Sequence, residues 1–147
     1  MLETELGSLR PRGAFYTTQH TQIRQKMAKS LVGLWTNGDC TEMDIAEPEK
    51  GHLTGWYKIA VGTPREASVP LKGLVNHTKA DSPCFSFCVS MGEIGGDSCN
   101  AVVGQYFNHN GEEALKTLWL MRAGVDSHED NWGATRVGEN TFKRKTA

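Results

Sequence analysis

Short β-favouring runs separated by turn sequences fill the chain from Leu31 onward. The turns follow one another at roughly the 8 to 12 residue spacing that is typical of a sandwich or a barrel. Several carry Asn, Asp and Gly, the residues that reverse a chain, as in Asn37-Gly38-Asp39 and Asn108-His109-Asn110-Gly111. The predicted strands are Leu31–Asn37, Thr41–Ala46, His52–Val61, Val69–Val75, Cys84–Met91, Asn100–Phe107, Ala114–Arg122 and Ala134–Lys143.

Short connections between consecutive strands predict an up-and-down arrangement, in which each strand pairs with the next. Eight such strands can close on themselves, which removes the sheet edges and leaves room inside for a small ligand. The content of 16 glycines against 5 prolines agrees with a chain rich in turns. The predicted fold class is therefore all-β, an eight-stranded antiparallel up-and-down β-barrel.

Composition and length limit what else the chain can be. Its 16 Lys+Arg and 17 Asp+Glu leave a formal net charge of -1, which gives no reason to expect a nucleic-acid partner. No apolar run reaches the roughly 18 to 20 residues of a membrane span, and residues 1–30 contain no apolar stretch typical of a secretion signal. Residues 1–29 are polar and are predicted to form a flexible extension, followed by one barrel domain over residues 30–147.

The seventh predicted strand is apolar on both of its faces. Strand alternation places Leu115, Thr117, Trp119 and Met121 on one face and Leu118 and Leu120 on the other. A barrel strand that is apolar inside and outside suggests that its outer face is covered, which points to an oligomer. The alternative is that one face packs under a loop of the same chain.

Three sequence stretches carry a more specific signal. They are Gly33-Leu34-Trp35-Thr36-Asn37, Thr54-Gly55-Trp56-Tyr57 and Trp132-x-x-Thr135-x-Val137-Gly138-x-Asn140-x-Phe142. Each alone is ordinary strand sequence. Together and in this order, with Leu118-Trp119-Leu120-Met121-Arg122 before the third, they resemble the avidin and streptavidin family from about Leu31 to Lys143. The resemblance implies an eight-stranded barrel, usually a tetramer, that binds biotin without a chemical reaction.

The resemblance also implies a role for each ligand-binding residue. Biotin's ureido group has one carbonyl acceptor and two N–H donors, and each needs a partner in a dry site. Asn37, Thr41 and Tyr57 would donate to the carbonyl, and Asn140 would accept from one N–H. The remaining implied contacts are Trp119, Met91 and Met121 around the ring system, Asn100 near the thioether, Ser98 and the loop containing Thr63 at the carboxylate, and Trp132 of a neighbouring subunit.

Some positions depart from the family pattern. Ile59 stands where the resemblance implies a Ser or Thr that would accept the second ureido N–H, and Val102 replaces an aromatic wall residue. An unpaired buried donor costs about 1 to 3 kcal/mol, so weaker biotin binding than in the family's best members is expected. Two alternatives stay open: a carrier of another small hydrophobic molecule, and a structural or oligomerisation module with a decayed ligand site.

The remaining chemistry-bearing residues point away from catalysis and metal binding. Cys84 and Cys88 would lie about 13 Å apart on one strand face, too far for one zinc ion or one disulfide. Whether Cys99 bridges to another cysteine or all four, Cys40 included, are free buried thiols stays open. His109 and His128 fall in turns with no nucleophile nearby, so no enzyme activity, metal or cofactor is expected. The family resemblance implies a secreted homotetramer or dimer that does not contact nucleic acid or membrane.

Overall fold

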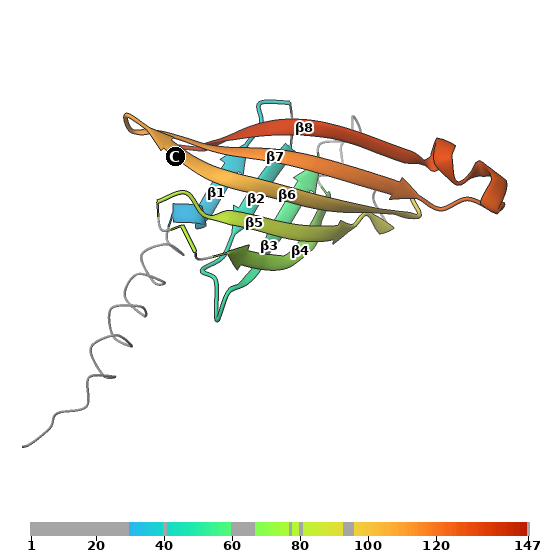
Figure 1. Cartoon of the computed structure of the whole chain (residues 1–147), viewed down its shortest axis with the longest axis horizontal. Coiled ribbons are helices and arrows are strands. Elements are labelled where there is room, and N and C mark those ends of the chain that lie inside the picture. The colour runs from blue at the N-terminus through green and yellow to red at the C-terminus, as the bar shows by residue number, and fades with distance from the viewer. Residues whose placement is uncertain are drawn as a thin grey trace, which may run out of the picture.

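Eight antiparallel strands form a closed barrel in the computed structural model, which describes residues 30–39, 41–59, 67–76, 78–79, 81–92 and 96–146 (Figure 1). Each strand pairs with the next along the chain, and the last pairs with the first. The strands are β1 Gly33–Thr36, β2 Thr41–Ile45, β3 His52–Ile59, β4 Ala67–Asn76, β5 Cys84–Ser90, β6 Ser98–His109, β7 Glu112–Ala123 and β8 Thr135–Arg144. Two short 3-10 turns, η1 His128–Asp130 and η2 Trp132–Ala134, lie between β7 and β8.

The predicted fold class is confirmed, and only the strand ends differ from the prediction. The first strand begins at Gly33 rather than Leu31, and Ala134 belongs to η2 rather than to the last strand. The sixth strand is longer than predicted, because its pairing with β7 continues out to His109 and Glu112. Residues 1–29 and Val61 lie outside the described residues, so the proposed domain boundary stays a prediction.

Strand alternation builds the core from one face of every strand. Leu53, Leu71, Phe87 and Leu115 are at most 2% exposed and point into the barrel. Glycine allows two strands to approach closely at Gly55, where a Cβ atom would lie 2.0 Å from the carbonyl oxygen of Asp44. No helix among the described residues is long and apolar enough to cross a membrane.

One end of the barrel is closed by Arg144, near the C-terminus, and we call it the Arg144 end. The guanidinium group lies 4.3 Å from the ring centroid of Trp35 and donates to the carbonyls of Ser30 and Val32, at 2.8 and 2.6 Å. It also pairs with both carboxylate oxygens of Glu113, at 2.5 and 2.8 Å. The hydrogen bond from Arg144 is the main reason that the pKa of Glu113 lies below its ordinary value.

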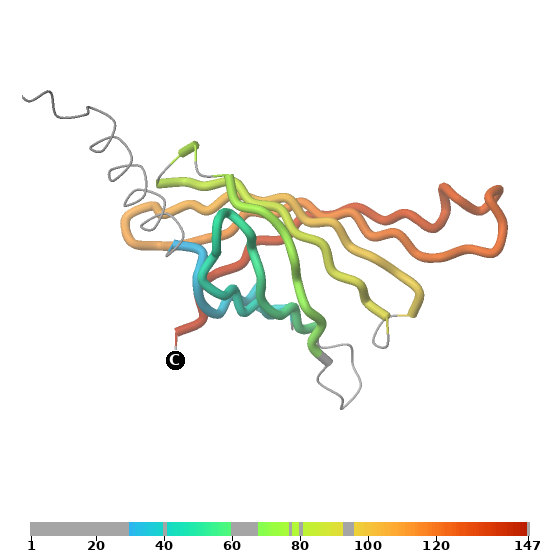
Figure 2. The backbone as a smooth tube through the Cα atoms, turned by 90° about the horizontal axis from the view of Figure 1, so that it is seen from below, coloured from blue at the N-terminus to red at the C-terminus, as the bar shows by residue number. Residues whose placement is uncertain are grey.

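The opposite end is formed by the turn after β1, by the end of β3 and the start of β4, and by the described parts of the connections that join β5 to β6 and β7 to β8; we call it the Asn37 end. There β7 and β8 extend past the other strands and carry η1 and η2 outward, as the orange and red segments of Figures 1 and 2 show. The barrel therefore has one short closed end and one end with a projecting arm.

Candidate functional site

The predicted ligand-binding residues that the structure describes lie toward the Asn37 end. They come from five of the eight strands, from the turns that follow β1 and β5, and from η2. Thr63 lies outside the described residues, as does Cys40. The residues in question are Asn37, Thr41, Tyr57, Met91, Ser98, Asn100, Trp119, Met121, Trp132 and Asn140.

A tight turn fixes the side chain of Asn37. Its Oδ1 accepts from the backbone N–H groups of Asp39 and Thr41, at 3.0 and 3.1 Å, while its own N–H donates to the Thr41 carbonyl at 3.2 Å. Gly38 adopts φ 81° between them, a left-handed conformation that glycine reaches without strain. Because the oxygen is occupied, the amide Nδ2 is the group left for another acceptor, and it has no partner among the described residues.

Tyr57 presents an apolar ring and a free hydroxyl to the interior. The residue is 7% exposed, and its ring centroid lies 6.0 Å from that of Phe87. Burial raises the pKa of the phenol, so the hydroxyl stays protonated and able to donate. No hydrogen-bond partner faces this hydroxyl within the described part of the chain. On the neighbouring strand pair, Thr41 of β2 lies opposite Ile59 of β3, so a polar residue faces an apolar one there.

Trp119 is held in place by a glycine on the next strand. Trp119 and Gly138 are directly opposed in the β7–β8 register. A Cβ atom at Gly138 would lie 2.4 Å from Cζ2 of the indole, so only glycine lets the ring lie flat over β8. Trp119 also opposes Val102 on β6 and packs against the core. The predicted aromatic wall thus depends on a residue that the sequence alone does not mark as part of it.

Asn100 carries an unpaired buried atom. It stands between Val89 and Met121 in the β5–β6–β7 register. Its Nδ2 points toward the Met91 sulfur at 4.0 Å, whereas its Oδ1 is buried without a hydrogen-bond partner. Most buried polar atoms in proteins are paired, so an orphaned acceptor marks a place where a water or a ligand donor completes the structure.

Asn140 and Ser98 differ in how fully they are engaged. The backbone carbonyl of Asn140 accepts from the Thr117 hydroxyl at 3.1 Å, whereas its side-chain amide has no partner among the described residues. Ser98 is 8% exposed, and its backbone donates to Gly96 at 2.8 Å and accepts from Met91 at 2.9 Å. Only side-chain groups of these two residues are available for a ligand.

Trp132 lies apart from the other predicted residues. It belongs to η2 on the projecting arm and is 86% exposed. Its indole therefore does not line the interior of its own barrel.

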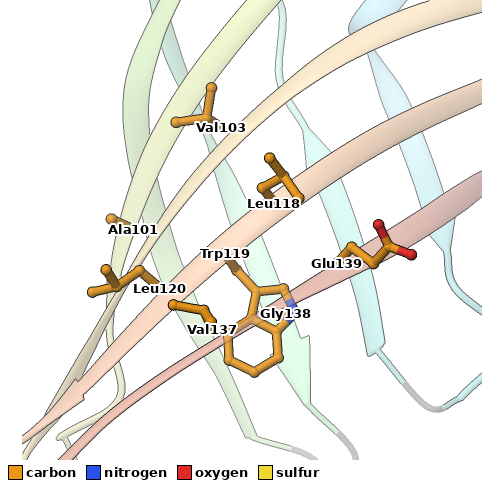
Figure 3. A pocket seen from close by; sticks show the side chains of 8 residues that line it. All are labelled: Ala101, Val103, Leu118, Trp119, Leu120, Val137, Gly138 and Glu139. Carbon is orange, nitrogen blue, oxygen red and sulfur yellow. The ribbon is translucent and has the colours of Figure 1, made fainter.

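The outer face of β6, β7 and β8 carries an apolar patch, which we call the outer patch. Figure 3 shows side chains gathered there over a groove of about 740 Å³. Leu118 and Val137 are 65% and 72% exposed, so no described loop covers them and the alternative of packing under a loop gains no support from the described residues. The patch consists of Ala101, Val103, Leu118, Leu120 and Val137.

The described cysteines carry no covalent link. Cys84, Cys88 and Cys99 are free and exposed, so neither a disulfide among them nor buried thiols are found. Across the described residues, no group of three or more His, Cys, Asp or Glu side chains is arranged to hold a metal ion.

Sequence reasoning missed three residues that organise the barrel. Arg144 and Glu113 close one end, and Gly138 admits Trp119. A strand-end arginine and a glutamate beside a turn look like ordinary surface charges in a sequence. Their role appears only when the register brings β7, β8 and the segment before β1 together.

A family model described as "Avidin family" matches residues 25–145. The chain belongs to the avidin family. It is 42% identical to avidin of Gallus gallus over 120 residues, which cover 78% of each chain. It is 40% identical to avidin-related protein 4/5 of Gallus gallus over 119 residues, which cover 78% of this chain and 77% of the relative.

Solved structures of avidin-like proteins share the barrel. A biotin-binding protein from chicken superposes with a TM-score of 0.70 at 38% identity, covering 79% of this chain and 96% of its own. Xenavidin superposes with a TM-score of 0.69 at 36% identity, covering 78% of this chain and 97% of its own. The arrangement of β1 to β8 is therefore an avidin-family barrel.

Proposed function

We propose that the chain binds biotin non-covalently inside the Asn37 end of the barrel and releases it unchanged. The observation that carries the proposal is the set of unpaired polar groups there. Asn37 Nδ2 and the Tyr57 hydroxyl are donors without partners among the described residues, and a urea carbonyl oxygen is an acceptor that could use both. The two similar proteins named avidin and biotin-binding protein support the choice of ligand.

Each side chain then has a distinct role toward biotin. Asn37, Thr41 and Tyr57 donate to the ureido oxygen, and Asn140 accepts from one ureido N–H. Trp119, Met91 and Met121 surround the ring system, and Asn100 lies near the thioether. Ser98 and Thr63 hold the carboxylate, and Trp132 comes from a second copy of the chain.

Affinity is expected to be lower than a fully paired site would give. Ile59 has no acceptor for the second ureido N–H, and an unpaired buried donor costs about 1 to 3 kcal/mol. That cost corresponds to roughly a tenfold to hundredfold loss of affinity.

Isothermal titration with biotin tests this function. The unsubstituted chain should release heat and bind one biotin per chain, and Asn37→Ala should abolish most of the signal. Asn76→Ala, which removes an exposed asparagine at the Arg144 end, is the matched control and should bind normally. Absence of heat with biotin, together with binding of another apolar molecule, would favour the carrier function instead. Biotin recovered by denaturing the complex should be chemically unchanged.

We also propose self-association through the outer patch, as a homodimer or homotetramer. The exposed side chains of Val103, Leu118 and Val137 form a continuous apolar surface of the kind that marks a protein interface. Light scattering should show that Leu118→Glu lowers the molar mass, because a buried unpaired carboxylate is costly. Thr54→Glu, on the exposed outer face of β3, should leave the mass unchanged.

Secretion is proposed on family membership. Cells that express the natural gene should accumulate the chain in their medium, and retention of the chain inside the cells would contradict the proposal.

A further inference from the structure

We infer that Arg122 is a positioning residue that holds the loop carrying Trp132 in the form in which its indole is offered to a second copy of the chain. The inference rests on the proposed function, because the use of that indole is to cover biotin in the neighbouring barrel. One side chain near the end of β7 would thus fix the part of the loop that carries Trp132.

Arg122 spans the base of the projecting loop. Its Nη1 donates to the backbone carbonyl of Asn131 and to the Thr135 hydroxyl at 3.3 Å. Asn131 immediately precedes Trp132, and Thr135 immediately follows η2. The guanidinium group therefore grips the chain on both sides of the three-residue turn that contains the indole.

Other contacts fix the rest of the loop. Ser127 caps η1 by accepting from the Glu129 backbone N–H at 3.2 Å. Gly124, where the loop begins, donates to the Asp97 carbonyl at 2.6 Å. A Cβ atom at Gly124 would lie 2.1 Å from an Asp97 carboxylate oxygen, so the two loops meet closely. With these contacts in place, Arg122 supplies the cross-link on the Trp132 side.

The exposure of Trp132 explains why such a link is useful. Because the Trp132 indole is 86% exposed, fixing its position adds little packing energy to its own chain. Ordering a loop before association lowers the entropic cost of binding, and a large aromatic side chain is a typical interface anchor. Arginine suits the task because Nη1 of its planar guanidinium carries two N–H donors in a fixed geometry, one for each acceptor.

Hydrogen–deuterium exchange on the full chain tests the first step. Arg122→Gln should raise the exchange of the backbone amides of residues 131–135, and Arg122→Lys, which keeps the charge and N–H donors on a single nitrogen but loses the planar guanidinium, should raise it less. Lys143→Gln removes an exposed cation from β8 near the Arg144 end and should leave that exchange unchanged. Equal exchange in Arg122→Gln and the unsubstituted chain would overturn the inference.

A double-mutant cycle on biotin dissociation tests the second step. Arg122→Gln should speed dissociation about three- to tenfold in the chain that has Trp132, and should have no further effect in Trp132→Ala. An equal acceleration in both backgrounds would show that Arg122 acts elsewhere and would overturn the inference. Failure of the unsubstituted chain to retain biotin would overturn the proposed function and this second step, whereas the exchange result would still decide whether Arg122 orders the loop.

Discussion

The two ends of the barrel differ in whether their polar side chains are hydrogen-bonded to other parts of the chain. At the Arg144 end the polar groups around Trp35 pair with one another: Arg144 with Glu113 and two carbonyls, and the Tyr106 hydroxyl with Glu113 at 2.8 Å. At the Asn37 end the Tyr57 hydroxyl, the Asn37 amide nitrogen and the Asn100 oxygen have no partner among the described residues. Paired groups stabilise a fold, whereas unpaired ones are available to a ligand. Removing a paired group at the first end should therefore lower stability, whereas removing an unpaired polar group at the second should weaken ligand binding without lowering stability.

The largest expected effect is at the Arg144 end. Arg144→Met should lower the free energy of unfolding by about 2 to 4 kcal/mol, because it takes the cationic partner from the Glu113 carboxylate, the donor from two carbonyls and the cation from Trp35. Chemical denaturation measures the change. Lys143→Met, at the neighbouring exposed position, should cost less than about 0.5 kcal/mol. A similar small cost for Arg144→Met would show that the closed end does not stabilise the barrel.

Gly138→Ala should displace the Trp119 side chain, because the added methyl group takes the space that the indole occupies. The added Cβ would lie 2.4 Å from the Trp119 indole, so the ring must move, and overpacking of this kind costs about 1 to 3 kcal/mol. Biotin affinity should fall by roughly tenfold or more, because the aromatic wall is displaced. Near-ultraviolet circular dichroism and titration report the two changes. Gly133→Ala, where no atom lies within 4 Å of the added carbon, should leave the spectrum unaltered.

A pair of tyrosines compares the ends directly. Tyr57→Phe should weaken biotin binding by about tenfold and leave the unfolding free energy nearly unchanged, because its hydroxyl has no partner in the described residues. Tyr106→Phe should lower stability by about 1 kcal/mol through loss of the bond to Glu113, with biotin affinity unchanged. A loss of stability in Tyr57→Phe, or a loss of biotin affinity in Tyr106→Phe, would contradict the contrast between the two ends.

Asn100→Leu should stabilise the unliganded chain by about 1 kcal/mol. The substitution replaces a buried amide that has an orphaned oxygen with an apolar side chain of similar size. Thermal unfolding without biotin measures the effect. A loss of stability would mean that a bound water already satisfies the oxygen.

The smallest expected effect is a pH dependence carried by the Arg144 end. The pKa of Glu113 is lowered in the folded chain, first by the hydrogen bond from Arg144. Its contribution to stability is therefore fully present above the unfolded pKa of about 4.3 and is lost as the pH falls through the lower folded value. Unfolding curves between pH 6 and 2.5 should show this loss, and Glu113→Gln should flatten the curve there.

The strand pattern and the family motifs were readable because they are local. Turn residues at regular spacing predicted eight strands, and strand alternation predicted the face on which Leu115, now seen to be fully buried, lies. The ligand-binding residues stay predictions, yet the structure gathers most of the described ones at one end. The exposure of the Trp132 side chain could not be predicted from the neighbouring residues, because it depends on how far β7 and β8 carry η2 away from the barrel.

By itself, the sequence determined the all-β class, the number and order of strands and the kinship with avidin, since period-two alternation and short turns are properties of neighbouring residues. Only the tertiary structure decided that Arg144 meets Glu113, that Gly138 makes room for Trp119 and that Arg122 grips the Trp132 loop. Each of those contacts joins residues from different elements. Their existence depends on the strand register and on closure of the barrel, which no local pattern specifies.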